Sequence, residues 1–348
     1  MAKSVMASRI HLKEDGTILL GEHVSCDGFA YGRPVRVQTH IHSDHMVGFN
    51  TSKANQTIIM SKPTKDLLNA LYNADLQYRS NICSIGVGSC HTVNNELIEL
   101  LPSHHMLGSM QVAVTCVDKH RVGYSSDFFW PVDKVIEVDE LIVDSTYGDP
   151  SRVRNYIPSQ VDDKVASIVA ASLRAGKSTA LISYHGRIEY ALYMLSNFVT
   201  KYPLICSPKV ASLAAVYNEN GYAMPKVIPS DSDEGISLLR RHELCLAFIS
   251  MPERRHLPWI DRFAKITLSA YMTRPDDPVL CYGNGDYSIA FTDHADFEGT
   301  LEYIKRTGAN FVWTDPRTGN AEALAHAIKR HLGINSQIAP RIKSKSWG

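Results

Sequence analysis

Short apolar segments separated by turns make up the first third of the chain. Apolar Val35 and Val37 alternate with polar Arg36 and Gln38, and this period of two predicts a strand that runs into His40. The runs LIELL, MQVAVTCV and LIVD predict further strands at 97–101, 110–117 and 141–144.

From about residue 150 the pattern changes to helices that alternate with strands. Val161, Val165 and Ile168 have helical spacing, with Ser159 as the expected N-cap and Gly176 as the expected C-terminal stop. Apolar runs predict buried strands at 179–184, 245–250, 266–269 and 311–314. Apolar residues at helical spacing predict helices over 188–199, 297–304 and 324–332. This alternation is typical of a parallel sheet with helices on its faces.

Composition places the chain among globular proteins. Of its 348 residues, 44% are hydrophobic and 21% are charged, which excludes a disordered, collagen-like or coiled-coil protein. Lys and Arg number 36, as do Asp and Glu, so nucleic-acid binding would depend on a local groove and not on a basic surface.

Targeting signals and cysteine usage point to the cytoplasm. No uncharged apolar run approaches the roughly 20 residues that span a bilayer, and the start MAKSVMASRI lacks the apolar stretch of a secretory signal. The 7 cysteines are scattered, with no CxxC pair. We therefore expect reduced thiols in a cytoplasmic protein without a membrane partner.

The segment THIHSDH at 39–45 carries the clearest chemical signal. It places His40, His42, Asp44 and His45 within six residues directly after an apolar strand. Imidazole and carboxylate groups suit zinc and similar divalent ions. Alternate residues of an extended chain project the same way, so His40 and His42 are expected to bind one ion, and Asp44 and His45 to face a second.

Further candidate residues follow other predicted strands. One of the adjacent histidines His104 and His105 is expected to complete the first metal site. Asp127 in GYSSDFF is placed to bridge two ions, as carboxylates do in two-metal hydrolases. Asp144 closes the strand LIVD, and His294 lies in the downstream segment FTDHADF; taken alone, each also fits an ordinary turn or cap residue.

Together these segments resemble the motifs of one known family. THIHSDH resembles the HxHxDH signature of the metallo-β-lactamase fold, with Asp27 as the carboxylate that supports this loop. HHMLGS and YSSDF resemble the third and fourth motifs of its nuclease branch. DSTYG at 144–148 and FTDHADF at 291–297 are similar to the first two added motifs of the β-CASP nucleases. Within these nucleases the chain resembles the short mRNA-3′-end-processing-type or DNA-ligase-associated exonuclease-like group.

The last motif departs from the family pattern. There the family usually has a histidine after a strand, whereas this chain reads FVWTDPRTG, with Asp315 in the place of a second-metal ligand. An aspartate can bind zinc or manganese, but the change is expected to alter the metal preference, weaken the second ion or mark a degenerate enzyme.

The resemblance implies a fold, a chemistry and a partner. The fold is a metallo-β-lactamase αββα sandwich built from 1–150 and 266–348, with an inserted β-CASP α/β domain at 151–265. Two divalent ions, zinc by default or manganese, would activate a hydroxide that cuts single-stranded RNA or DNA in the cleft between the domains. The implied metal ligands are His40, His42, Asp44, His45, His105, Asp127 and Asp315. The implied catalytic residues are Asp44, Asp144 and His294, with His294 as a proton donor oriented by Asp144.

Two other functions stay open at this point. The change at Asp315 also fits a catalytically weak or inactive β-CASP scaffold that partners a nuclease or ligase. A metallohydrolase of a small ester or thioester is the third reading, although it has no use for the motifs at 144–148 and 291–297. The resemblance to this family is also compatible with a homodimer.

Overall fold

The computed structural model describes residues 8–86, 88–198, 201–270, 274–283, 285–317 and 319–342. These fall into two compact units. The first unit is formed by Met1–Lys65, Asp75–Arg152 and His294–Gly348, and the second by Asp66–Ala74 and Val153–Asp293.

One seven-stranded sheet of the first unit carries the segment THIHSDH. Its strands are β1 (Ile10–Lys13), β2 (Ile18–Leu20), β3 (Val24–Cys26), β4 (Val35–Val37), β5 (Thr57–Ser61), β6 (Ile82–Ile85) and β21 (Arg341–Ile342). They lie in the order β21-β1-β2-β3-β4-β5-β6, with β3 to β6 parallel. The predicted strand at 35–37 is confirmed as β4, and the metal-type residues follow its C-terminal end.

A second seven-stranded sheet carries the other candidate residues. Its strands are β7 (Cys90–Val93), β8 (Glu96–Pro102), β9 (Met110–Thr115), β10 (Arg121–Tyr124), β11 (Glu140–Val143), β19 (Phe311–Thr314) and β20 (Asn335–Ile338). They lie in the order β20-β19-β11-β10-β9-β8-β7, with β10, β11, β19 and β20 parallel. The predicted strands at 97–101, 110–117, 141–144 and 311–314 all fall in this sheet.

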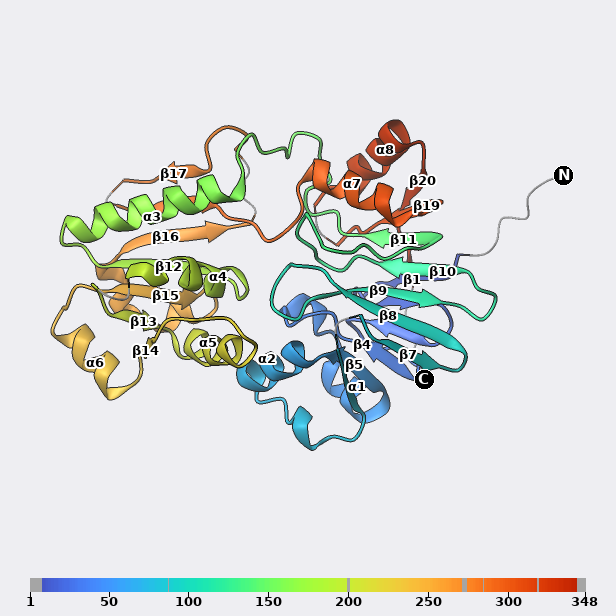
Figure 1. Ribbon diagram of the computed structural model, residues 1–348, viewed down its shortest axis with the longest axis horizontal. Helices are drawn as coiled ribbons and strands as arrows, with labels where there is room; N and C mark the ends of the chain where they lie inside the picture. The colour runs from blue at the N-terminus through green and yellow to red at the C-terminus, as the bar shows by residue number, and fades with distance from the viewer. Residues whose placement is uncertain are drawn as a thin grey trace. The chain divides into compact units, whose positions relative to one another are not determined.

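The two sheets of the first unit pack face to face. A single hydrophobic core joins Leu12, Val24 and Val37 of one sheet to Val112 and Ile142 of the other. Helices occupy the remaining faces: α1 (Phe49–Asn55) contacts β5, and α8 (Ala321–Leu332) contacts β19, β20 and α7 (Phe297–Thr307), as Figure 1 shows. The expected sandwich of two sheets flanked by helices is therefore present. Short helices η1 (Ser43–His45) and η2 (Leu76–Tyr78) complete the unit, and α2 (Lys62–Tyr72) runs across the division at Lys65.

The second unit is built on a mostly parallel sheet. Its strands are β12 (Thr179–Ser183), β13 (Leu204–Cys206), β14 (Ile228–Pro229), β15 (Leu246–Ser250), β16 (Ala264–Ser269), β17 (Val279–Cys281) and β18 (Tyr287–Ala290). They lie in the order β14-β13-β15-β12-β16-β18-β17, and β17 alone among them pairs antiparallel. Its helices are α3 (Pro158–Arg174), α4 (Arg187–Met194), α5 (Pro208–Glu219), α6 (Asp233–Arg240), η3 (Ser196–Phe198), η4 (Glu253–His256) and η5 (Pro258–Arg262). The predicted alternation of helices with parallel strands is confirmed here.

Two details differ from the sequence-based expectation. The helix expected to be capped by Ser159 begins at Pro158, because Ile157 is its N-cap and donates its backbone N–H to Gln160 Oε1 at 3.0 Å. Gly176 does follow the helix end, with φ +72°. The division into units also differs from the expected limits of 151 and 265. Strand β16 pairs with β12 and β18 pairs with β16, so residues 264–290 group with the second unit.

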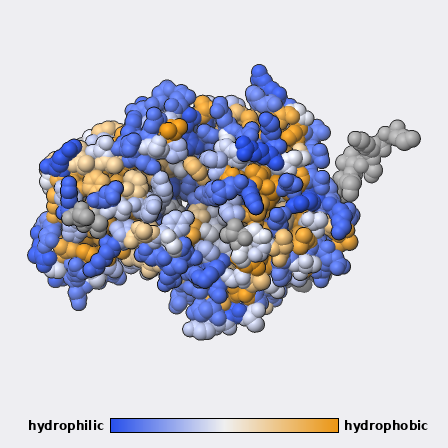
Figure 2. All heavy atoms as spheres, in the orientation of Figure 1, coloured by the Kyte–Doolittle hydropathy of each residue, from blue (hydrophilic) through white to orange (hydrophobic). Residues whose placement is uncertain are grey.

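Within the described part of the chain, no helix is long and apolar enough to cross a membrane. On the face drawn in Figure 2, hydrophobic residues lie scattered among hydrophilic ones.

Candidate metal centre

A buried carboxylate shapes the loop that carries the metal-type residues. Asp27 follows β3 with φ +56° and is almost fully buried. Its Oδ1 accepts the backbone N–H of Thr39 at 2.8 Å, and its Oδ2 accepts the Thr39 hydroxyl and His45 Nδ1, both at 2.7 Å. One side chain therefore holds both ends of the segment 39–45, in the supporting position that the resemblance gives to Asp27.

Two polar side chains of β4 and its end fix the same loop from within the sheet. Arg36 is completely buried and donates to the carbonyl oxygens of His45 at 2.9 Å and Val47 at 2.8 Å. Gln38 accepts from Arg36 and donates to the carbonyl oxygen of His40 at 2.6 Å. Because these carbonyls would otherwise be unpaired and buried, the network holds one conformation of the loop.

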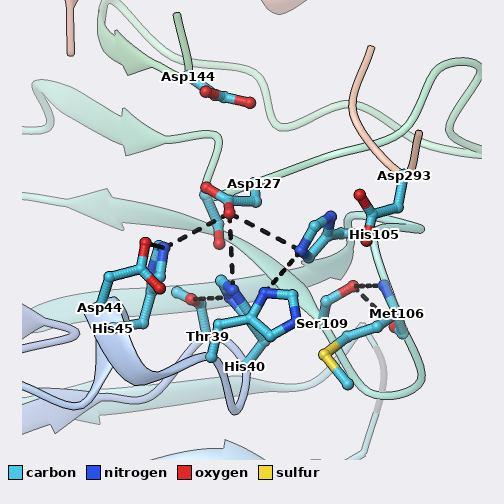
Figure 3. Close-up of polar contacts among 12 residues, drawn as sticks. Thr39, His40, Asp44, His45, His105, Met106, Ser109, Asp127, Asp144 and Asp293 are labelled. Atoms are coloured by element: carbon cyan, nitrogen blue, oxygen red, sulfur yellow. Dashed lines mark hydrogen bonds and ion pairs between the residues drawn. The ribbon is translucent and has the colours of Figure 1, made fainter. Parts of the chain in front are cut away.

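Four side chains from three loops converge on one point. The possible ligand atoms of His40, His42, His105 and Asp127 lie within 4.8 Å of one another. Asp127 Oδ2 lies 3.7 Å from both His40 Nε2 and His105 Nε2, and His105 Nε2 lies 3.1 Å from His42 Nδ1. Figure 3 shows the Asp127 carboxylate facing His40 and His105. Bonds of about 2.0–2.2 Å in a tetrahedron separate ligand atoms by roughly 3.3–3.6 Å, so this spacing fits one divalent ion.

The tautomer of His40 strengthens this interpretation. The single hydroxyl hydrogen of Thr39 is donated to Asp27, so the Thr39 oxygen, 3.0 Å from His40 Nδ1, accepts the proton of that ring nitrogen. The lone pair of His40 Nε2 then points into the group, where this atom is buried without a hydrogen-bond partner. A buried polar atom left unpaired in this way fits a metal ligand.

Electrostatics favour the ligand forms of two of these groups. Burial, with a further contribution from His45, holds the pKa of His40 well below its usual value, so the imidazole is neutral. Burial alone would raise the pKa of Asp127, but His45, His294 and His40 lower it well below the usual range. The group therefore offers neutral imidazole and an ionised carboxylate, the forms that bind cations.

The loop after His105 depends on a glycine. Gly108 has φ +80°, and a Cβ there would lie 2.7 Å from the backbone nitrogen of Thr64. The turn is closed by the Ser109 hydroxyl, which accepts from the backbone N–H of Met106 and donates to its carbonyl oxygen. The neighbouring His104 is directed elsewhere, with Nε2 3.3 Å from the exposed carboxylate of Asp133.

Asp44 and His45 lie at the edge of the group. His45 Nε2 lies 3.5 Å from Asp127 Oδ2 and 3.6 Å from Asp44 Oδ2, and the Asp44 side chain is 65% exposed. Burial alone would lower the pKa of His45, but Asp127 and Asp27 raise it well above its usual value. In the metal-free chain the His45 imidazole is therefore protonated and lies between the carboxylates of Asp27 and Asp127.

Asp144 and His294 form a hydrogen-bonded pair beside the metal group. His294 Nδ1 donates to Asp144 Oδ2 at 2.9 Å, while Asp144 Oδ1 accepts the backbone N–H and the hydroxyl of Thr146 at 2.9 and 2.7 Å. The His294 ring centre lies 4.7 Å from that of His105. Asp127, Asp144 and His294 also offer ligand atoms within 4.8 Å of one another. The structure thus brings the pair expected from the sequence to the metal group.

Asp315 is engaged by a residue that the sequence did not single out. Its Oδ2 accepts Arg317 Nε at 2.7 Å and lies 2.6 Å from Nη2, and its Oδ1 accepts the backbone N–H of Arg317 at 2.9 Å. Arg317 also donates to the Tyr124 hydroxyl at 2.8 Å and to the carbonyl oxygen of Gly16 at 3.1 Å. Among the residues that the structure describes, the groups with metal-ligand spacing do not include Asp44, His45 or Asp315.

Sequence reasoning missed Arg36, Gln38 and Arg317. The first two carried a weak signal, as polar residues next to the HxHxDH segment, but the alternating pattern gave no indication that both are fully buried. Arg317 carried none, because an ion pair two residues along a loop has no sequence signature.

Comparisons with known proteins include a solved structure of similar fold. No protein-family model matches the sequence. A crystal structure of a protein of unknown function from Enterococcus faecalis V583 superposes with a TM-score of 0.55 at 13% identity, covering 88% of this chain and 79% of that chain. The metallo-β-lactamase fold protein YhfI from Bacillus subtilis matches 39% of this chain and 67% of its own at 13% identity, with a TM-score of only 0.31, too low to assign the fold.

One curated relative is similar enough in sequence to show a shared family. An uncharacterized protein in the lig 3′ region of Acidianus ambivalens is 31% identical over 134 residues, which are 38% of this chain and 94% of that protein. The chain therefore belongs to the same family as this uncharacterized protein.

Proposed function

We propose that the chain is a metal-dependent hydrolase that cuts phosphodiester bonds in single-stranded nucleic acid, and that it is a β-CASP member of the metallo-β-lactamase fold. The observation that carries the proposal is the buried His40 Nε2, left without a hydrogen bond in a group of three histidines and one carboxylate. Zinc is the expected ion, since imidazole with one carboxylate suits it, and manganese is the alternative.

A divalent ion in this group would supply Lewis-acid charge and lower the pKa of a water molecule. The chain's own residues have distinct tasks. His40, His42, His105 and Asp127 would hold the ion, and Asp27 and Arg36 fix the loop that presents the first two. His294 is held through Nδ1 by Asp144, so its Nε2 is the atom that would hold a proton for the leaving oxygen. A carboxylate partner stabilises the protonated imidazole that this step needs.

Two features support nucleic acid over a small ester as substrate. The segments DSTYG and FTDHADF, which supply Asp144 and His294, resemble motifs of nucleases. The curated relative is named for its place in the 3′ region of lig, in keeping with the ligase-associated group that the sequence resembles. The partner is therefore single-stranded RNA or DNA, and the product ladder in the test below distinguishes the two and gives the polarity.

The test compares wild type with Asp127→Asn on matched 5′-labelled single-stranded RNA and DNA, with zinc and then with manganese. Losing a residue that only hydrogen-bonds to a metal ligand lowers activity by up to about 100-fold. Losing the ligand itself is expected to lower the cleavage rate by more than that. Asp133→Asn is the matched control, because this carboxylate is 86% exposed and pairs only with the outward-facing His104 among the ion pairs described.

Cleavage retained by Asp127→Asn would contradict the assignment of the site. The absence of cleavage of either strand by metal-loaded wild type would contradict the nuclease itself. It would favour the non-catalytic scaffold that partners a nuclease or ligase.

A further inference from the structure

Three aspartates follow adjacent parallel strands at one edge of the second sheet. Asp127 follows β10, Asp144 follows β11 and Asp315 follows β19, and these strands are direct neighbours in that order. Because C-terminal ends of neighbouring parallel strands meet at one edge, each carboxylate is a candidate ligand for a cation there. The three carboxylates differ in the hydrogen bonds and ion pairs that each already makes within the protein.

We infer that the chain binds a single divalent ion tightly, in the group of His40, His42, His105 and Asp127, and that an ion pair between Asp315 and Arg317 replaces a ligand for a second ion. This inference rests on the proposed metal-dependent function and narrows it. It replaces the two ions that the sequence resemblance implies.

The Asp315 carboxylate is already bound by Arg317. Both of its oxygens accept from Arg317, at 2.9 Å from the backbone and 2.7 Å from Nε, and the carboxylate is 3% exposed as a residue. The guanidinium is itself anchored by Tyr124 and by the carbonyl of Gly16. The guanidinium contacts Oδ2 alone, and Oδ1 accepts only the backbone N–H. Binding a cation at Asp315 would disturb this buried ion pair and bring the cation close to the Arg317 charge, and both effects disfavour a second ion.

The Asp144 carboxylate is satisfied as well. One oxygen accepts two hydrogen bonds from Thr146, and the other accepts from His294. A second ion held by Asp127, Asp144 and His294 would have to displace the His294 bond and would share Asp127 with the first ion.

The remaining position, at Asp44 and His45, is incomplete. His45 Nε2 faces both Asp44 and Asp127, at 3.6 and 3.5 Å, but Asp44 is a well-hydrated side chain, 65% exposed. Without Asp315 this position has three protein donors, and one of them is shared. The first group differs from all of these, because His40 Nε2 is buried there without a hydrogen bond.

The experiment counts metal per chain. Wild type is loaded with excess zinc, dialysed against metal-free buffer and measured by inductively coupled plasma mass spectrometry. The expected content is one zinc per chain, unchanged in Asp44→Asn and lost in His42→Ala. Two zinc ions per wild-type chain, or halving of the content by Asp44→Asn, would overturn the inference and leave the proposed function intact. No retained zinc would overturn the proposed function and the inference with it.

A second variant tests the ion pair itself. Arg317→Met frees the Asp315 carboxylate and is expected to raise the retained zinc from one to two per chain, with circular dichroism confirming that the variant is folded. One zinc in both proteins would overturn the role given to the Asp315–Arg317 pair. If Arg317→Met does not fold, Asp44→Asn on the exposed loop still decides between one ion and two.

Discussion

Arg36 offers the sharpest test of how the metal loop is built. Its guanidinium is completely buried and donates to the carbonyls of His45 and Val47, to Gln38 Oε1 and to the Ser52 hydroxyl. Arg36→Met keeps an unbranched apolar stem and removes every one of these donors. The loop that carries the metal-type histidines then loses its internal support.

The expected loss follows from two opposing effects. The carbonyl oxygen of His45 keeps a hydrogen bond from Gln38 Nε2, so three acceptors are left unpaired. At about 2 kcal/mol each, the middle of the usual range, they cost about 6 kcal/mol. Burial lowers the pKa of Arg36 to about 10, so keeping the charge inside the fold costs about 3 kcal/mol, which the substitution recovers. The difference is a net loss of about 3 kcal/mol of unfolding free energy, at the lower end of the cost of breaking a buried charged network.

The assay is urea unfolding of the metal-free chain, together with zinc affinity measured by competition with a chelating dye. We expect the unfolding free energy to fall by the amount given above. We also expect a zinc affinity reduced about 10–100-fold, the usual effect of losing a residue that supports a metal ligand through hydrogen bonds. Arg79→Met is the control, because this exposed arginine makes a single 3.5 Å hydrogen bond and its loss should cost less than about 0.5 kcal/mol. A loss below about 1 kcal/mol with unchanged zinc affinity for Arg36→Met would refute the reasoning.

Three further predictions concern the ion, the pH and a close backbone approach. Zinc at 100 times its dissociation constant should stabilise the metal-free wild type by about 2.7 kcal/mol, seen as a higher melting temperature, and should leave Asp127→Asn unchanged; an equal rise in both would place the ion elsewhere. In the metal-free chain, burial alone would lower the pKa of His45, but Asp127 and Asp27 raise it well above 6.5, so its contribution to stability is complete below pH 6.5 and is lost as the pH rises through the folded-state pKa. His45→Gln should therefore flatten the alkaline fall of the urea midpoint, and an undiminished fall would assign the effect to another group. Gly148→Ala would place a Cβ 2.5 Å from the carbonyl oxygen of Asn320 and should cost about 1–3 kcal/mol, whereas a neutral thermal shift would show that the backbone yields there.

Sequence patterns were informative where one local rule governs the structure. The strand at 35–37, the buried run of β12 and the helix that ends before Gly176 follow directly from periodicity and end signals. The histidines and aspartates at strand ends were also found from sequence, because parallel strands bring their C-terminal ends to one edge.

Arg36 shows where periodicity fails. The alternation at 35–38 predicts one face in the core and one in solvent, but α1 packs on the neighbouring β5, and all three residues of β4 are buried. A strand inside a parallel sheet covered on both faces has no solvent side, so its polar residues must find partners within the protein. The pattern alone does not distinguish these two situations.

Asp315 shows a second limit, which is long-range context. Its position after a strand predicts a ligand, yet its carboxylate accepts from Arg317, which is itself held by the Tyr124 hydroxyl of a distant strand. The grouping of residues 264–290 with the second unit depends on long-range context as well. Strand β16 pairs with β12, which lies more than 80 positions earlier, and β18 follows through β16; no local signal records that pairing.

The most direct test of the metal-dependent nuclease is a metal titration of cleavage by metal-free wild type. Zinc, and in a parallel series manganese, is added in fractions of an equivalent to labelled single-stranded oligonucleotide and enzyme, and the initial rate is recorded. The account predicts no cleavage without metal, a rate that rises in proportion to added ion, and saturation near one equivalent. Full cleavage by the metal-free chain, or none at any metal content, would contradict it.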